Sequence, residues 1–352
     1  KGLALLTFIA ILWLTEAIHI TITALLIPIL AVVLAMPMAK GDELEPITTQ
    51  AALTTFADPT IFLFFGGFAL ASALHIQKLD KKIATWIISL SGGHLGASVL
   101  AIFLVTAALS MWISNTATAA MMLPLALGLL SHLDVEKDRK TFVFILLGIA
   151  YSASIGGLGT IVGSPPNAIA AKALGYDFAD WMKVGLPMMF IILPAMLVSL
   201  YLVLRPKLNH KVNFVTENIP WTTTRIATMI LFLCTATAWI FSKKLTENFG
   251  ITQPDTWIAI LAACMVVILG TATWKQVAEN TDWGVLYLFG GGLTLSAVLK
   301  DSGSSLVLGQ TLANAFGDSS PLVIIFVVAT FIIFLTEFTS NTASAALLVP
   351  VF

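Results

Sequence analysis

Charged residues are scarce in this chain of 352 residues, where they make up 11% against 58% hydrophobic residues. A soluble domain carries about 25% charged residues to cover its water-facing surface. The mean hydropathy of +0.95 points the same way. The chain lacks the polar side chains that a water-soluble globule needs, so most of its surface must face lipid. The composition predicts an all-α polytopic membrane protein with room for about nine or ten apolar segments of roughly 20 residues each.

Three further absences exclude classes of function. The formal net charge is −1, so the basic excess that nucleic-acid binding needs is missing. The only two cysteines, Cys234 and Cys264, lie in apolar runs and indicate neither a disulfide framework nor a metal site. No apolar run contains a Ser/His/Asp or paired-aspartate arrangement suited to hydrolysis. We therefore expect a multi-pass protein of the cell's inner (plasma) membrane that is not an enzyme and has the lipid bilayer as a partner.

Apolar runs follow one another with short loops, so residues 1–352 are predicted to form a single transmembrane domain. The first run is long enough for two short crossings broken near Thr15-Glu16 and His19, or for one long helix plus a re-entrant piece, and both remain open. Because the last run is still apolar at its end, we expect a C-terminal part beyond residue 352. The runs lie at about 3–38, 59–75, 98–130, 142–174, 184–204, 222–242, 256–274, 283–299 and 321–352.

Two runs, at about 98–130 and 321–352, each carry a Ser-Asn-Thr cluster near the middle. Each is too short for two comfortable crossings and too polar for one, which is typical of a re-entrant helical hairpin. Ser, Asn and Thr favour helix N-caps, so the second half-helix is expected to start at the motif. Its free N–H groups suit an anion, and the oxygens of the tip suit a hard cation such as sodium. The alternative is that these residues only cap and pack two helices.

An internal repeat is the strongest pattern in the chain. The same motifs recur in the same order with nearly constant spacing, and an odd number of crossings separates the copies, so they run in opposite directions. Inverted-topology repeats with discontinuous helices are typical of secondary transporters, whereas a channel filter needs several copies around one axis. The first repeat is predicted at about 58–204 and the second at about 282–352. The matched residues are Asp58 with Asp282, Phe65-Gly66-Gly67 with Phe289-Gly290-Gly291, Ser114-Asn115-Thr116-Ala117 with Ser340-Asn341-Thr342-Ala343, and Pro124 with Pro350.

A glycine-rich stretch ending in Gly163-Ser164-Pro165-Pro166-Asn167 interrupts the run at 142–174. Glycines weaken a helix and prolines suit the first turn of a new one, so a second broken helix is predicted here. Its exposed carbonyls around Gly159 and Gly163 would complete a cation site with the first tip. The alternative is a kink that serves packing.

Charged groups inside the runs are few. Glu16 with His19, Glu337, and the repeat-related Asp58 and Asp282 are the candidates for a proton relay. The two aspartates are expected to cap their helices instead. Glu337 is expected to be structural, because Met111 occupies the matching position of the first repeat.

The Phe-Gly-Gly helices, the two Ser-Asn-Thr motifs and the Gly-Ser-Pro-Pro-Asn loop together resemble the divalent anion/sodium symporter family of dicarboxylate and citrate carriers, over essentially the whole chain. Within it they are most similar to the bacterial sodium-coupled succinate carriers. The resemblance implies a homodimer whose protomers each combine a scaffold domain with a moving transport domain, in an elevator mechanism.

The resemblance also implies site residues. It assigns the first sodium site to Ser110, Ser114, Asn115 and the Gly163 carbonyl, and the second to Thr336, Thr339, Asn341 and a backbone carbonyl from a loop beyond residue 352. It places the dicarboxylate between Asn115-Thr116 and Asn341-Thr342, with Ser164 and Pro165 nearby.

The expected function is a symporter that couples sodium ions to the import of C4-dicarboxylates such as succinate by alternating access. Sulfate or citrate remains open as the substrate. A proton-coupled anion exchanger using Glu16, Glu337 and the aspartates, or a channel, are the alternatives from other classes.

Overall fold

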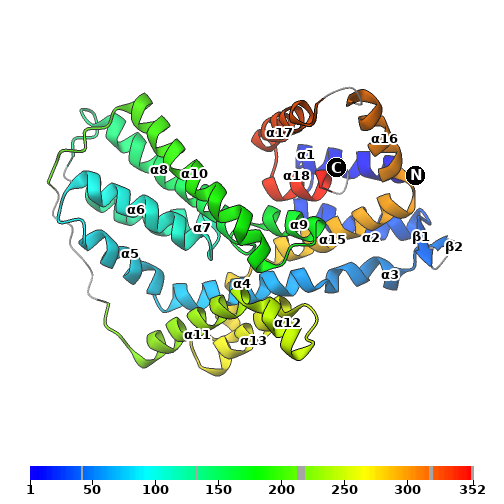
Figure 1. Ribbon diagram of the computed structural model, residues 1–352, viewed down its shortest axis with the longest axis horizontal. Coiled ribbons are helices and arrows are strands. Elements are labelled where there is room, and N and C mark those ends of the chain that lie inside the picture. The colour runs from blue at the N-terminus through cyan, green and yellow to red at the C-terminus, as the bar shows by residue number, and fades with distance from the viewer. Residues whose placement is uncertain (41–42, 132, 212–218, 317–319, 350–352) are drawn as a thin grey trace. The chain divides into compact units, whose positions relative to one another are not determined.

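A computed structural model describes residues 1–40, 43–131, 133–211, 219–316 and 320–349 of the chain. The described chain is mostly helical (Figure 1), which confirms the predicted all-α class. Some elements were not predicted. Helices α5 (Leu79–Ser89) and α16 (Ser304–Phe316) lie outside the predicted runs, and β1 (Pro37–Lys40) pairs antiparallel with β2 (Glu43–Pro46) in a short hairpin. Pro350, the predicted repeat partner of Pro124, lies outside the described residues together with the end of the second predicted hairpin.

The remaining elements are helices, most of them apolar. In chain order they are α1 (Gly2–Thr15), α2 (Ile20–Val33), α3 (Thr49–Thr54), η1 (Thr55–Ala57), α4 (Pro59–Ile76), α5 (Leu79–Ser89), α6 (Leu95–Ser110), α7 (Asn115–Leu130), α8 (Arg139–Gly156), η2 (Gly157–Gly159), α9 (Pro165–Leu174), α10 (Phe178–Leu204), α11 (Thr223–Ile240), α12 (Ser242–Phe249), α13 (Pro254–Ile268), α14 (Trp274–Asn280), α15 (Trp283–Asp301), α16 (Ser304–Phe316), α17 (Pro321–Phe338) and α18 (Asn341–Leu348).

Several of these helices have the length and composition of membrane spans. Five stretches among the described residues qualify, and α12 with α13, bent by 108° at their break, adds a sixth if the pair is one broken span. The five are Thr49–Ile76, Arg139–Gly159, Phe178–Leu204, Thr223–Ile240 and Trp283–Asp301. Helices α1, α2, α6, α7 and α17 are apolar but shorter.

The first apolar run is resolved into two helices, α1 and α2, of 14 residues each. At 1.5 Å per residue each is about 21 Å long, shorter than a hydrocarbon core of about 30 Å. Glu16 ends α1 with a left-handed φ of 48°, and Nδ1 of His19 accepts the Thr21 N–H at 3.3 Å to open α2. The break therefore falls where the sequence predicts it.

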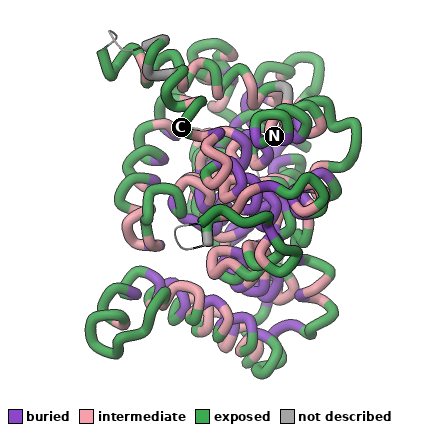
Figure 2. Tube along the Cα trace, turned by 90° about the vertical axis from the view of Figure 1, so that its right-hand side faces the viewer, coloured by how far each residue is buried: buried purple, intermediate pink, exposed green. Residues whose placement is uncertain are grey.

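The chain divides into two compact units, which are described separately. Unit 1 comprises residues 1–62, 172–175 and 282–352, and unit 2 comprises residues 63–171 and 176–281. The predicted first tip lies in unit 2 and the predicted second tip in unit 1. Buried and exposed positions alternate along many helices of both units (Figure 2), so these helices turn one face towards their neighbours.

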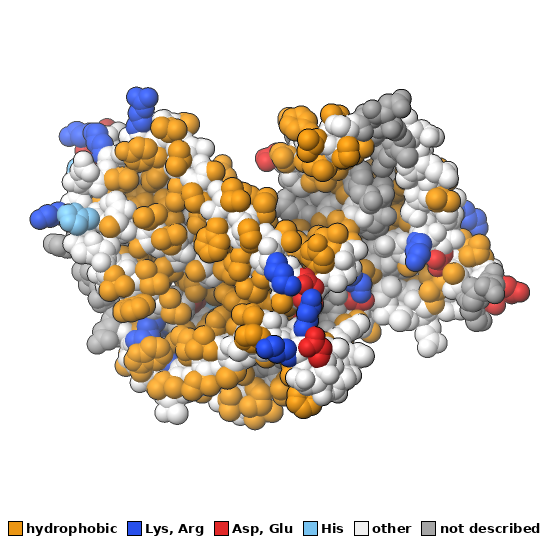
Figure 3. All heavy atoms as spheres, viewed as in Figure 1, with side chains coloured by type: hydrophobic (Ala, Val, Ile, Leu, Met, Phe, Trp, Pro, Cys, Tyr) orange, Lys and Arg blue, Asp and Glu red, His pale blue; other side chains and the backbone are white. Residues whose placement is uncertain are grey.

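In unit 2, helices α5 to α8 share one hydrophobic core. The rings of Phe103 and Phe144 meet edge to face at 5.6 Å between centroids. Helices α10 and α11, by contrast, bury few of their side chains. Hydrophobic side chains cover much of this unit in Figure 3, as expected of helices that face lipid.

The Phe-Gly-Gly motifs have a packing role that the sequence analysis did not assign. A Cβ on Gly66 of α4 would lie 2.5 Å from the Ala259 carbonyl oxygen of α13, within unit 2. A Cβ on Gly291 of α15 would lie 2.5 Å from the Ala24 carbonyl oxygen of α2, within unit 1. In each case a glycine lets two helix backbones touch, as small residues do in membrane helix pairs.

Candidate functional site

The first Ser-Asn-Thr motif lies at the break between two helices, where the sequence predicts one. Helix α6 ends at Ser110 and α7 begins at Asn115, with Ser114 as the N-cap. The Ser114 hydroxyl accepts the Ala117 N–H at 3.3 Å. The start of α7 therefore presents free N–H groups and the positive end of the helix dipole, which together attract an anion. Whether the two helices re-enter the membrane stays a prediction.

Behind this tip lies a buried group of oxygens, here called the oxygen cluster: Ser110 Oγ, Asn115 Oδ1 and the carbonyl oxygens of Ala153 and Gly163. The fully buried Ser110 hydroxyl is 2.8 Å from Asn115 Oδ1 and 2.7 Å from the Ala153 oxygen. A hydroxyl has one proton, so it satisfies only one of these two acceptors at a time. Because the Ala153 oxygen also accepts the Gly157 N–H, the oxygens of the cluster left without a further donor among the described residues are Asn115 Oδ1 and the Gly163 oxygen.

The glycine-rich residues 156–164, here called the glycine loop, close the cluster from the other side. A Cβ on Gly157 would lie 2.5 Å from Asn115 Oδ1 and 3.1 Å from the Gly163 oxygen. A Cβ on Gly163 would lie 2.5 Å from the Gly157 oxygen and 3.0 Å from the Met111 oxygen. Only glycine fits at these two positions, because any side chain would enter the space where the oxygens converge.

Several carbonyls of the glycine loop accept hydrogen bonds from the described chain. Trp181 Nε1 donates to the Leu158 oxygen at 2.9 Å, and the Asn167 amide donates to the oxygens of Gly157 and Thr160. The Gly163 oxygen accepts no hydrogen bond from any part of the chain that the structure describes. A donor-poor set of neutral oxygens suits a hard, singly charged cation such as sodium, and the residues present fit such an ion.

The structure thus brings Ser110, Asn115 and Gly163 together in unit 2, and Ser114 is the N-cap of α7. Ser164 and Pro165 directly follow Gly163, where α9 starts. Sequence reasoning missed Ala153, Thr160 and Asn167 at this place. Asn167 belongs to the quoted Gly-Ser-Pro-Pro-Asn segment, so the motif contained a signal for it, whereas nothing local marks Ala153.

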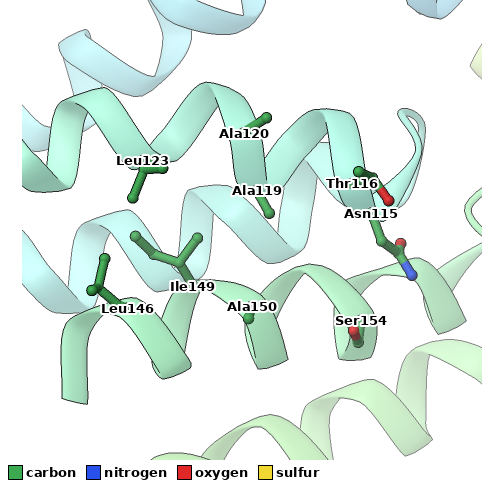
Figure 4. A pocket seen from close by; sticks show the side chains of 9 residues that line it. All are labelled: Asn115, Thr116, Ala119, Ala120, Leu123, Leu146, Ile149, Ala150 and Ser154. Carbon is green, nitrogen blue, oxygen red and sulfur yellow. The ribbon is translucent and has the colours of Figure 1, made fainter. Parts of the chain in front are cut away.

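A cavity of about 610 Å³ runs along the seam of α7 and α8 from this tip. Asn115, Thr116 and Ser154 form its polar end, and aliphatic side chains form the rest (Figure 4). The cavity places Asn115 and Thr116, two predicted substrate ligands, on one accessible wall. The aliphatic lining consists of Ala119, Ala120, Leu123, Leu146, Ile149 and Ala150.

The second tip, in unit 1, also has a break at its motif, with Ser340 as N-cap and Asn341 as the first residue of α18. Its hydroxyls bond locally. Thr336 Oγ1 donates to the Ile333 oxygen at 3.0 Å, and Thr339 Oγ1 lies 3.2 Å from the Leu335 oxygen and 2.5 Å from Ser344 Oγ. Asn341 and the adjacent Thr342 begin the helix, as predicted, but no acceptor surplus like that of the first tip is found in the described part of this unit.

The charged candidates sit at helix starts and exposed positions. Asp58 Oδ1 accepts the Thr60 N–H at 3.0 Å and Asp282 Oδ1 accepts the Val285 N–H at 3.1 Å, so both aspartates cap helices as predicted. Asp58 also forms an ion pair with Lys172, which was not predicted. Glu16 and Glu337 are exposed.

Comparisons with known proteins agree with the resemblance found in the motifs. A family model described as "Citrate transporter" matches residues 10–352. An uncharacterized transporter of Haemophilus influenzae is 57% identical over the whole chain, which covers 76% of that protein. An uncharacterized transporter of Methanocaldococcus jannaschii is 37% identical over the whole chain, covering 78% of that protein. The sodium-dependent dicarboxylate transporter SdcS of Staphylococcus saprophyticus is 33% identical over 99% of the chain, covering 71% of that protein.

Proposed function

We propose that this chain, which belongs to the citrate transporter family, is a secondary active symporter that couples sodium ions to the import of C4-dicarboxylates such as succinate. The family and the relatives are transporters rather than enzymes, and the apolar helices make the chain a multi-pass protein of the plasma membrane. The coupling ion and the substrate are the parts of this statement that need testing.

The observation that carries the proposal is the donor-poor oxygen cluster beside the start of α7. Asn115 Oδ1 shares the single proton of Ser110 with the Ala153 oxygen, which also accepts the Gly157 N–H, and the Gly163 oxygen receives no bond from the described residues. A cation bound among these oxygens supplies positive charge within reach of Asn115 and Thr116. The same tip then offers a carboxylate both helix N–H groups and a neighbouring cation. The name of the SdcS relatives supports sodium as that cation.

Charge balance also favours coupling to sodium. Neither Ser-Asn-Thr motif contains Lys or Arg, so a dianion depends on neutral donors and on co-bound cations. Moving two negative charges inward against 100 mV costs about 4.6 kcal/mol. Two sodium ions cancel this cost, and a third lets the membrane potential drive uptake.

We assign the substrate to both tips, with Asn115 and Thr116 on one and Asn341 and Thr342 on the other, and Ser164 and Pro165 nearby. The first sodium ion is assigned to Ser110, Ser114, Asn115 and the Gly163 oxygen. The second is assigned to Thr336, Thr339 and Asn341. The proposal includes a homodimer that achieves alternating access by an elevator mechanism. In it, the two tips are the ends of re-entrant hairpins.

Citrate is the second candidate substrate, because the description of the family model names it. Citrate differs from succinate by a third carboxyl group, a hydroxyl group and a longer carbon chain. A transporter selective for C4-dicarboxylates should discriminate against citrate at a pH where all three carboxyl groups are ionised.

The test is uptake of labelled succinate into proteoliposomes with an inward sodium gradient, and then with potassium in its place. We expect saturable uptake that requires sodium and is inhibited more strongly by other C4-dicarboxylates than by citrate or sulfate. Uptake that is equal in sodium and potassium would falsify sodium coupling. Stronger uptake of labelled citrate than of succinate would make citrate the assigned substrate and would leave the assignment of sodium as the coupling ion unchanged.

A further inference from the structure

Asn167 closes the Gly-Ser-Pro-Pro-Asn segment and has no part in the binding sites assigned above. It lies in the first turn of α9 and is 4% exposed. Its side-chain nitrogen donates to the Gly157 oxygen at 2.7 Å and to the Thr160 oxygen at 2.8 Å. An amide nitrogen has two protons, so both are used on two carbonyls of the glycine loop. One buried side chain thus fixes the curvature of a segment whose glycines leave it flexible.

Thr160 carries this restraint to the first tip. Its fully buried hydroxyl donates to the Met111 oxygen, which lies in the break between α6 and α7. The same hydroxyl oxygen accepts the Gly163 N–H at 3.1 Å. Asn167, Thr160 and Met111 therefore form a continuous chain of hydrogen bonds from α9 through the glycine loop to the tip.

These bonds decide which carbonyls remain available. The oxygens of Gly157, Thr160 and Met111 are occupied by donors from Asn167 and Thr160. The N–H of Gly163 donates to Thr160, which holds the Gly163 peptide in place. Gly157 lies against both Asn115 Oδ1 and the Gly163 oxygen, so these two oxygens are on the same side of the loop. Without the hydroxyl of Thr160, the Gly163 N–H keeps only its longer bond to the Thr160 carbonyl oxygen, at 3.3 Å, and the Gly163 peptide is freer to rotate its oxygen out of the cluster.

We propose that Thr160 and Asn167 are positioning residues that set the affinity and the size selectivity of the first-tip cation site without touching the ion. The inference rests on the proposed function, because it takes sodium as the ion of that site. Sodium and lithium differ in radius, and a site tuned to one of them depends on fixed oxygen positions. Loosening the loop is expected to weaken sodium binding more than lithium binding.

The experiment uses the full chain in proteoliposomes and in detergent. Thr160→Val keeps the shape of the side chain and removes the hydroxyl, whereas Thr160→Ser restores it. Asn167→Asp keeps the shape and removes both donors, and Asn167→Ala removes the side chain. Ser152→Ala is the matched control: its hydroxyl is buried on α8 in the same unit and bonds to none of the described residues.

Two readouts are needed. The first is the sodium concentration that gives half-maximal succinate uptake, separated from the maximal rate. The second is the sodium-induced rise in melting temperature without substrate, repeated with lithium, because it does not depend on transport. Loss of one buried hydrogen bond typically changes an equilibrium by about three- to tenfold. We expect Thr160→Val and Asn167→Asp to raise the half-maximal sodium concentration by about tenfold and to lower the sodium-to-lithium preference.

Thr160→Ser should recover most of the wild-type sodium response, and Ser152→Ala should match wild type throughout. A merely structural role would reduce the yield and the maximal rate while leaving the sodium concentration dependence unchanged. That outcome in folded Thr160→Val and Asn167→Ala proteins overturns the inference and leaves the symporter intact. A wild-type protein that responds to sodium in neither readout overturns the proposed function, and the inference with it.

Discussion

The two Ser-Asn-Thr tips have nearly the same sequence but satisfy their hydroxyls in different ways. In the first tip the Ser110 hydroxyl reaches Asn115 and the Ala153 carbonyl, which is 43 residues away. At the repeat-related position of the second tip, Thr336 bonds back to Ile333 of its own helix. Thr339 of the second tip pairs with Ser344 at 2.5 Å. In the first tip the residue matching Thr339 is Ile113, and Thr118, which matches Ser344, finds no partner among the described residues.

The difference lies in what packs against each tip among the described residues. The motif breaks the helix in both copies, and the glycine loop packs against the first tip. That loop places the Gly163 oxygen on the side of Asn115. We therefore expect a cation site where a Ser-Asn-Thr motif and such a loop meet.

The strongest test of this contrast replaces the asparagine of each tip by alanine. Asn115→Ala removes an oxygen of the cluster and the acceptor of Ser110, whereas Asn341→Ala removes no hydrogen bond found in the described chain. Losing a bond to a charged partner costs about 1.5–3 kcal/mol. We expect Asn115→Ala to raise the half-maximal sodium concentration by about 100-fold. Asn341→Ala removes a ligand assigned to the second sodium ion and should raise it by a smaller factor, because it breaks no hydrogen bond in the described chain. Equal effects of the two substitutions, measured by uptake against sodium concentration, would show that the tips are equivalent.

A smaller effect is expected from closing the space around the oxygen cluster. In Gly157→Ala the new methyl group meets Asn115 Oδ1, so the loop must shift, and we expect sodium-dependent uptake to fall at least about tenfold. Gly128→Ala on α7 is the control, because nothing lies within 4 Å of its new methyl group. That change should leave uptake unchanged and stabilise the helix by about 0.5–1 kcal/mol. Comparable uptake by the two variants would contradict the geometry of the glycine loop.

The N-caps offer a third and weaker contrast. The Ser114 hydroxyl caps α7, whereas the Ser340 hydroxyl caps nothing in α18. Replacing a capping serine by alanine costs about 1 kcal/mol. Ser114→Ala should lower the melting temperature in detergent by about 2 °C, and Ser340→Ala should leave it nearly unchanged. A larger fall in melting temperature for Ser340→Ala than for Ser114→Ala would indicate that the two caps are misassigned.

The smallest expected effects concern the hydroxyls of Thr118 and Ser344. Thr118→Val removes a buried hydroxyl without a described partner, and the free energy of unfolding should stay the same or rise by about 1 kcal/mol. Ser344→Ala removes a bonded hydroxyl and should lower it by about 1 kcal/mol. Denaturant titration of both variants measures the difference, and destabilisation by Thr118→Val would mean that its hydroxyl has a partner.

Much of the local architecture was predictable from sequence. The helix breaks at Glu16, at both motifs and in the glycine loop follow from capping residues, glycines and prolines, whose effects act within one turn. The bonds from Ser110 to Ala153 and from Thr160 to Met111 were not predictable. They join segments 43 and 49 residues apart, and depend on how the helices pack. The β1–β2 hairpin was missed because its alternation is short and lies between two strongly apolar runs.

The oxygen cluster and its positioning residues, Thr160 and Asn167, all lie in one continuous stretch of chain, residues 110–167. Chains fold from the N-terminus while the ribosome is still adding residues. The first-tip site can therefore assemble on the nascent chain before α15, α17 and α18 have been synthesised. The second tip then enters a bilayer in which its counterpart is already built, which gives the two halves an order of biogenesis as well as a difference in chemistry.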